Sequence, residues 1–122
     1  MTRRDPLRVN DYLDHILEAI DNINEYTAGM DGAGYLADKK TRDAVIRNFE
    51  VIGEACNNIA RHHGQFAKSH PEVPWNFAYE MRNALAHGYF KIDQDIVWTT
   101  IQTDLPRLKA ALRAVADSLP ND

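Results

Sequence analysis

The sequence predicts an all-α protein, built as an antiparallel four-helix bundle with an optional extra short helix. Three observations lead to this fold class. Apolar side chains recur every three or four residues over most of the 122-residue chain, as they do on the buried face of a helix. No stretch alternates apolar and polar residues over the length of a strand. Glycine and proline break the pattern into four long periods with short connections, which place neighbouring helices antiparallel.

The first predicted helix covers residues 6–27. Its apolar stripe keeps to one helix face and consists of Leu13, Ile16, Leu17, Ile20 and Ile23. The other faces carry several acidic side chains, so this helix is amphipathic. Residues 27–34 follow with three glycines and form the clearest break in the chain.

The second predicted helix covers residues 38–63 and ends at Gly64. Its apolar residues alternate spacings of four and three, as in a heptad repeat: Val45, Phe49, Ile52, Cys56 and Ile59. Gly53 within a helix costs about 1 kcal/mol relative to Ala, so we expect a close helix approach there. Cys56 is the single cysteine, which excludes an internal disulfide, and we expect it to be a small core residue.

The third predicted helix covers residues 74–87, after a loop or a short turn of helix. Pro74 suits an early helical position and Gly88 suits a helix end. Its predicted buried row consists of Phe77, Met81 and Leu85. We expect this helix to lie close to a second copy of the chain, because the heptad-like helices offer more apolar surface than one bundle needs.

The fourth predicted helix covers residues 93–118, with Asp93 as its N-cap. Its apolar positions again alternate by four and three: Ile101, Leu105, Leu108, Leu112, Val115 and Leu119. Pro106 has no backbone N–H to donate, so we expect it to kink or split this helix. The four helices together predict one domain that covers residues 1–122.

Charge is distributed unevenly along the chain. The net charge is −4, which argues against indiscriminate binding of nucleic acids. Residues 39–91 hold eight basic and five acidic side chains, whereas the rest holds six basic and thirteen acidic ones. The basic middle is suited to face RNA and the acidic flanks to meet a basic partner, although solvated helix faces would show the same pattern by chance. No apolar run is long enough for a membrane span and none resembles a secretory signal, so we expect a cytoplasmic protein.

An arginine, an amide, a histidine and a tyrosine gather near the end of the third predicted helix. They are Arg82, Asn83, His87 and Tyr89. On a straight helix Arg82 and His87 would lie about 140° apart around the axis, whereas Asn83 and His87 would share a face. A site that uses Arg82 and His87 together therefore needs a distorted last turn, a long arginine reach or a second subunit. In a twofold dimer, two such sets could line one cleft.

These residue types suit cleavage of RNA without a metal ion or any other cofactor. His87 could accept a proton from the ribose 2′-hydroxyl or donate one to the leaving oxygen. Arg82 could stabilise the charge on the pentacoordinate phosphorus, and Asn83 could support His87 or a phosphate oxygen. Each residue also has a simpler interpretation. His87 could cap helix carbonyls, Tyr89 could be an aromatic residue at the bundle end, and Arg82 could be a solvated charge.

The order and spacing of several motifs resemble the HepT-like branch of the HEPN superfamily. Its motif of Arg, four residues, His, one residue and Tyr matches Arg82, His87 and Tyr89. Further matches are Arg47 to Ala55, Pro74-Trp75, Ile92-Asp93, Val97-Trp98 and Asp104-Leu105-Pro106. The resemblance implies a helical homodimer that acts as a ribonuclease toxin, with Arg82 and His87 as catalytic residues. It also implies a minimal nucleotidyltransferase antitoxin as partner, which silences the toxin by transferring AMP to Tyr89.

Two other functions compete with the toxin hypothesis. The chain could be a non-catalytic helical partner that binds or regulates a nucleotidyltransferase, or a bundle that only binds RNA. Both share the fold expected of the toxin, so that the fold alone does not decide between them. A nucleotidyltransferase gene beside this one would favour the toxin and the non-catalytic partner over the bundle that only binds RNA.

Two other groups of polar residues were weighed as sites. His62, His63 and His70 lack the spacing of a zinc site, and we expect no metal there but solvated or phosphate-adjacent imidazoles. Glu50 and Glu54 share a helix face, but Arg47 lies one turn earlier and favours an ion-pair network over paired catalytic carboxylates. A supporting role near Arg82 stays open for the two glutamates.

Overall fold

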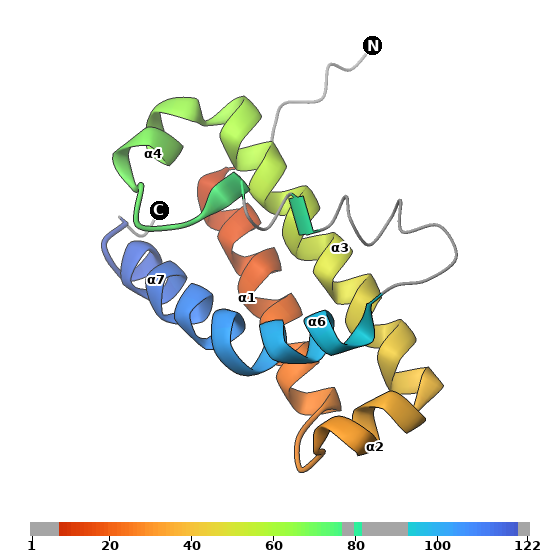
Figure 1. Cartoon of the computed structure of the whole chain (residues 1–122). Coiled ribbons are helices and arrows are strands. Elements are labelled where there is room, and N and C mark those ends of the chain that lie inside the picture. Colours follow the sequence, from red (N-terminus) through yellow and green to blue (C-terminus); the bar gives the residue numbers. More distant parts are fainter. Residues whose placement is uncertain (1–7, 77–79, 82–92, 120–122) are drawn as a thin grey trace.

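In the computed structural model, which describes residues 8–76, 80–81 and 93–119, the regular structure is entirely helical (Figure 1). The elements are α1 (Val9–Tyr26), α2 (Gly32–Ala37), α3 (Lys39–His62), α4 (Gly64–Ser69), α6 (Gln94–Thr99), the π-helical turn η1 (Thr100–Asp104) and α7 (Leu105–Asp117). No strand occurs in the part of the chain that the structure describes. The all-α prediction is confirmed.

The core lies where α1 packs against α3 and α7. Figure 1 shows α1 and α3 side by side and antiparallel, with α7 against the other side of α1. All five apolar positions predicted for each of the first two helices are buried, which confirms both stripes. Gly53 is also buried in α3. Burial of each of these large aliphatic side chains contributes about 1.5–3 kcal/mol relative to exposure.

The connection between α1 and α3 contains a helix, α2, where the glycines of the sequence predict only a break. α2 forms because the Asp31 carboxylate accepts a hydrogen bond from the backbone N–H of Gly34 (2.8 Å) and caps its first turn. Tyr35 then anchors α2 in the core, where its side chain is fully buried. The glycines hid this helix, although only Gly29 among the described glycines has a positive φ (77°).

The segment after α3 is also helical. The second predicted helix ends at His62, and the carboxylate of Asp38 caps its start by accepting from the N–H of Thr41 (3.1 Å). Gly64 is not only a stop, because it begins α4. This settles the choice between a loop and a short helical turn in favour of a helix.

The fourth predicted helix is interrupted before Pro106, as expected. Asp93 is its N-cap and accepts hydrogen bonds from the backbone N–H groups of Asp95 and Ile96. The wide turn η1 follows α6, and α7 begins at Leu105 with Pro106 in its first turn. A proline there lacks the N–H that an uninterrupted α-helix would need. The helical backbone continues through η1, so the helix is not split, and the π-helical turn within it has an identifiable cause in the sequence.

The third predicted helix lies only partly in the described part of the chain. Trp75, Asn76, Glu80 and Met81 are helical, and residues 77–79 and 82–92 lie outside the described residues. The four-helix bundle and the homodimer therefore remain predictions.

Candidate functional site

The residues predicted to carry the chemistry, Arg82, Asn83, His87 and Tyr89, lie outside the described residues. The structure describes the frame on both sides of them. We call residues 82–92 the motif segment. Trp75 and its neighbours precede it in the chain, and α6 follows it.

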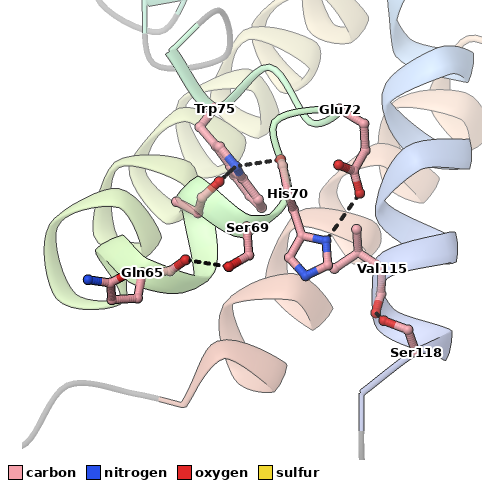
Figure 2. Close-up of polar contacts among 8 residues, drawn as sticks. Gln65, Ser69, His70, Glu72, Trp75, Val115 and Ser118 are labelled. Carbon is pink, nitrogen blue, oxygen red and sulfur yellow. Dashed lines mark hydrogen bonds and ion pairs between the residues drawn. The ribbon is translucent and has the colours of Figure 1, made fainter.

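The upstream anchor is built around the indole of Trp75. Its Nε1–H donates to two backbone carbonyls, those of Ala67 and His70, at 3.2 Å each, as Figure 2 shows. The ring is buried, with 8% of its surface exposed, and Phe66 of α4 packs against it at 6.2 Å between ring centroids. Because these carbonyls close the end of α4, one side chain joins α4 to the chain that leads into the motif segment.

His70 belongs to the same anchor. Its Nδ1 lies 3.1 Å from a carboxylate oxygen of Glu72 (Figure 2). The ring of His70 also packs against Phe66, at 4.6 Å between ring centroids. The pKa of the Glu72 carboxyl is lowered, first by a hydrogen bond from its own backbone N–H and then by the bond with His70. A carboxylate beside one imidazole nitrogen selects the ring's tautomer. His70 is therefore an oriented, partly buried imidazole, which corrects the solvated one of the two predicted alternatives, solvated or phosphate-adjacent, and only its His-x-Glu spacing indicated this contact.

The other candidate metal ligands do not converge. His62 is exposed, whereas His63 contacts Tyr12 edge-on, at 6.0 Å between ring centroids. Cys56 is a buried free thiol, and burial raises its pKa to about 12, so it is the core residue that we expected. Among residues 8–76, 80–81 and 93–119, no three His, Cys, Asp or Glu side chains lie together as metal ligands would.

The downstream anchor joins α6 to α2. The Tyr35 hydroxyl donates to Oε1 of Gln94 at 2.7 Å, and its ring stacks on Trp98 at 5.2 Å between centroids. Gly32 packs so closely on Trp98 that an added Cβ would lie 3.3 Å from its indole nitrogen. Burial raises the pKa of Tyr35 to about 12.

A small apolar pocket lies beside Met81, the residue that precedes the motif segment. Its volume is about 100 Å³, and its described lining consists of Phe49, Ile52, Met81, Thr100, Asp104, Leu105 and Leu108. Apolar side chains make up most of this lining, and Asp104 is its one ionisable group among the described residues. Such a pocket can hold an apolar side chain, but it offers little for proton transfer to a phosphodiester.

The carboxylates weighed as a catalytic pair form part of a helix surface instead. A carboxylate oxygen of Glu50 lies 3.7 Å from the guanidinium of Arg47, one turn away on α3, which confirms this one pair of the predicted ion-pair network. The Arg47 side chain is mostly exposed, so this pair contributes little to stability.

A separate observation concerns membranes: among the described residues, no helix is long and apolar enough to cross one.

Comparison with known proteins connects this frame to a family. The ribonuclease HepT-like family matches residues 16–115. The probable ribonuclease HepT of Thermococcus cleftensis is 46% identical over 99 residues, which cover 81% of this chain and 87% of that protein. A candidate RNase of Methanocaldococcus jannaschii is 36% identical over 115 residues, covering 94% of this chain and all of the relative. No solved structure matches the chain.

Proposed function

We propose that this chain, which belongs to the ribonuclease HepT-like family, is the toxin of a toxin–antitoxin pair and acts in the cytoplasm as one helical domain. The family makes it an endoribonuclease. The observation that carries the proposal is that the family match, residues 16–115, includes the whole of Arg82 to Tyr89. That stretch supplies the cation and the proton-transfer group that cleavage of a phosphodiester needs.

The proposed reaction uses the nucleophile that RNA itself carries. The ribose 2′-oxygen attacks the adjacent phosphorus while the bond from phosphorus to the 5′-oxygen breaks, which leaves a 2′,3′-cyclic phosphate and a 5′-hydroxyl. His87 takes the proton of the 2′-hydroxyl or gives one to the 5′-oxygen. Arg82 stabilises the charge that builds up on the phosphoryl oxygens, and Asn83 supports the imidazole or a phosphate oxygen. The chain's own side chains thus supply the catalytic groups, and we propose that no metal ion is needed.

We propose that the active form is a homodimer. On one straight helix Arg82 and His87 diverge by about 140°, so a twofold arrangement that brings two motif segments together would form a better site. The measurement is the molar mass by light scattering at micromolar concentration, alongside RNA cleavage. A monomer that cleaves RNA at full rate would contradict the dimer without contradicting the nuclease.

The nuclease proposal is tested with matched oligonucleotides. RNA should be cut, and the same sequence with 2′-deoxyribose at every position should resist, because it lacks the nucleophile. Mass spectrometry of the products should find 2′,3′-cyclic phosphate ends, and chelation by EDTA should leave the rate unchanged. Cleavage of the DNA strand, or cleavage that disappears with EDTA and returns with a divalent ion, would refute this mechanism.

We also propose that a nucleotidyltransferase antitoxin silences the toxin by modifying Tyr89. The phenol oxygen attacks the α-phosphorus of Mg²⁺-ATP, loses its proton and expels pyrophosphate, so that AMP becomes attached to the ring. Tyr89 is two residues from His87 in sequence, so the added phosphate would compete with substrate for Arg82 and the base would obstruct RNA.

Co-expression with the nucleotidyltransferase tests this regulation. Native protein should gain the mass of one or more AMP units and lose RNA cleavage. Tyr89→Phe should keep most of its activity and escape modification, because Phe preserves the ring but removes the acceptor oxygen. Silencing of the Phe variant without a mass change would indicate occlusion by the partner instead.

The alternative function is a non-catalytic partner or regulator of the nucleotidyltransferase. It would share the helical fold and the partner but not the chemistry. Expression of native protein and of His87→Ala distinguishes the two. Equal growth and equally intact RNA in both cultures would favour the regulator.

A further inference from the structure

The contact between Tyr35 and Gln94 lies where the chain returns from the motif segment to the helical framework. Gln94 is the first residue of α6, and the motif segment ends two residues before it. Tyr35 is 59 residues away in sequence, on α2. A hydrogen bond between the two side chains therefore fixes this return point from a distant part of the chain.

Helix α6 is held differently at its two ends. Its last residue, Thr99, continues through η1 into α7 with helical backbone throughout, whereas its first residue, Gln94, begins the helical run and depends on side-chain contacts for its position. Side-chain contacts also join α6 to other parts of the protein: Val97 is buried in the core, Trp98 stacks on Tyr35 and contacts Gly32, and Gln94 accepts from the Tyr35 hydroxyl. The first two hold the middle and end of α6, and the hydrogen bond holds its first residue.

We propose that Tyr35 and Gln94 are positioning residues for RNA cleavage, because their hydrogen bond orients the start of α6 and thereby the exit of the motif segment. The proposal rests on the proposed nuclease function. A displacement of about 1 Å at a catalytic group can lower the rate about 100-fold even when its cause lies outside the site. Neither residue is expected to touch RNA.

The fold offers a way to remove this bond while leaving the packing in place. Tyr35→Phe keeps the ring on Trp98 and leaves Val97 in the core, so the variant should fold. Since Gln94 is only partly buried, its amide can turn to water when the hydroxyl is absent. The hydroxyl of native Tyr35 stays protonated through neutral pH, so the bond is present under assay conditions.

The test compares four variants. Tyr35→Phe removes the donor, Gln94→Leu removes the acceptor, and Gln94→Glu keeps an acceptor oxygen for the same hydroxyl. Tyr12→Phe is the matched control, because Tyr12 is also a buried tyrosine but contacts His63 at the end of α3. For each variant kcat and KM on an RNA oligonucleotide are measured at a temperature where thermal melting shows it fully folded.

We expect kcat to fall about tenfold or more for Tyr35→Phe and Gln94→Leu with little change in KM. Gln94→Glu should recover most of the native rate, and Tyr12→Phe should match native protein. A role that is only structural would lower the melting temperature without separating kcat from KM. A kcat for Tyr35→Phe equal to that of Tyr12→Phe would overturn the proposal.

Amide hydrogen exchange supplies a readout that does not depend on RNA cleavage. Exchange in α6 should be faster in Tyr35→Phe than in native protein or Tyr12→Phe, while exchange in α1 and α3 stays the same. Unchanged exchange in α6 would overturn the proposal whatever the kinetics show. If native protein cleaved no RNA, the proposed function would fail, and exchange would still decide whether this bond orients α6.

Discussion

The pair α1–α3 and the two anchors of the motif segment are held by different kinds of contact. Between α1 and α3 the buried residues are mostly aliphatic, and the side-chain amide of Asn22 donates to Oδ1 of Asn48 at 3.1 Å. At the anchors, single aromatic side chains donate hydrogen bonds: Trp75 to two carbonyls and Tyr35 to Gln94.

Aliphatic burial scales with area and has no preferred direction, so it stabilises the domain without fixing a particular side chain to a fraction of an ångström. Hydrogen bonds add little net stability but specify direction. The comparison teaches that this chain separates stability from position. The α1–α3 pair supplies most of the buried residues, and we expect the anchors to orient the segment proposed to carry the chemistry.

The separation is tested most strongly at the motif itself. Arg82→Ala and His87→Ala should each lower the rate of RNA cleavage about 10²–10⁴-fold, as expected when proton transfer or transition-state charge stabilisation is lost. Helical content by circular dichroism and the urea midpoint should stay near native values, because the fold depends on the α1–α3 pair. A large loss of stability in either variant would mean that the motif is structural.

The opposite behaviour is expected in the core. Ile20 is fully buried, and Ile20→Ala should lower the free energy of unfolding in urea by about 2–5 kcal/mol, whereas Ile20→Val should cost about 0.5–1.5 kcal/mol. Cleavage per folded molecule should not change in either variant. The assay is run without urea, at a temperature where the variant is folded. A fall in kcat under these conditions would mean that burial in the core also positions the catalytic groups.

An anchor variant should affect both properties. Trp75→Phe leaves the carbonyls of Ala67 and His70 without their indole donor and should cost about 1–3 kcal/mol of unfolding free energy. Although this loss is smaller than that of Ile20→Ala, we expect RNA cleavage per folded molecule to fall as well. Parallel urea titrations and single-turnover assays on the two variants provide the check. A kcat of Trp75→Phe equal to that of native protein would mean that the upstream anchor does not position the catalytic groups.

The same separation explains what could be predicted from sequence. Periodic apolar residues reveal burial along one helix, so the stripes of α1 and α3, the N-cap Asp93 and the interruption before Pro106 were all predictable. α2 was missed because it has six residues and two glycines. The bond from Tyr35 to Gln94 joins residues 59 apart, and no local pattern encodes such a partner. The motif of Arg82 and His87 was assigned a catalytic role because the chain resembles the HepT-like family, and its geometry stays a prediction.

The smallest expected effect concerns pH and the cap of α3. The pKa of Asp38 is lowered from its ordinary value of 3.8, first by the hydrogen bond from the backbone N–H of Thr41 and then by one from the Thr41 side chain. A carboxyl whose pKa is lower in the folded state stabilises the fold above its ordinary pKa, and this contribution is lost as the pH falls through 3.8 and below. Asp38→Asn keeps an acceptor oxygen for the cap but does not titrate. Its unfolding free energy should therefore be close to native at pH 7 and decline less between pH 5 and pH 3.

Glu72→Gln, at the upstream anchor, should likewise reduce the decline in unfolding free energy between pH 5 and pH 3, because the pKa of Glu72 is also lowered. Urea titrations of native protein and both variants across this pH range measure the two contributions. If the unfolding free energy of Asp38→Asn declined more steeply between pH 5 and pH 3 than that of native protein, the Asp38 carboxyl would not be held ionised by the cap of α3.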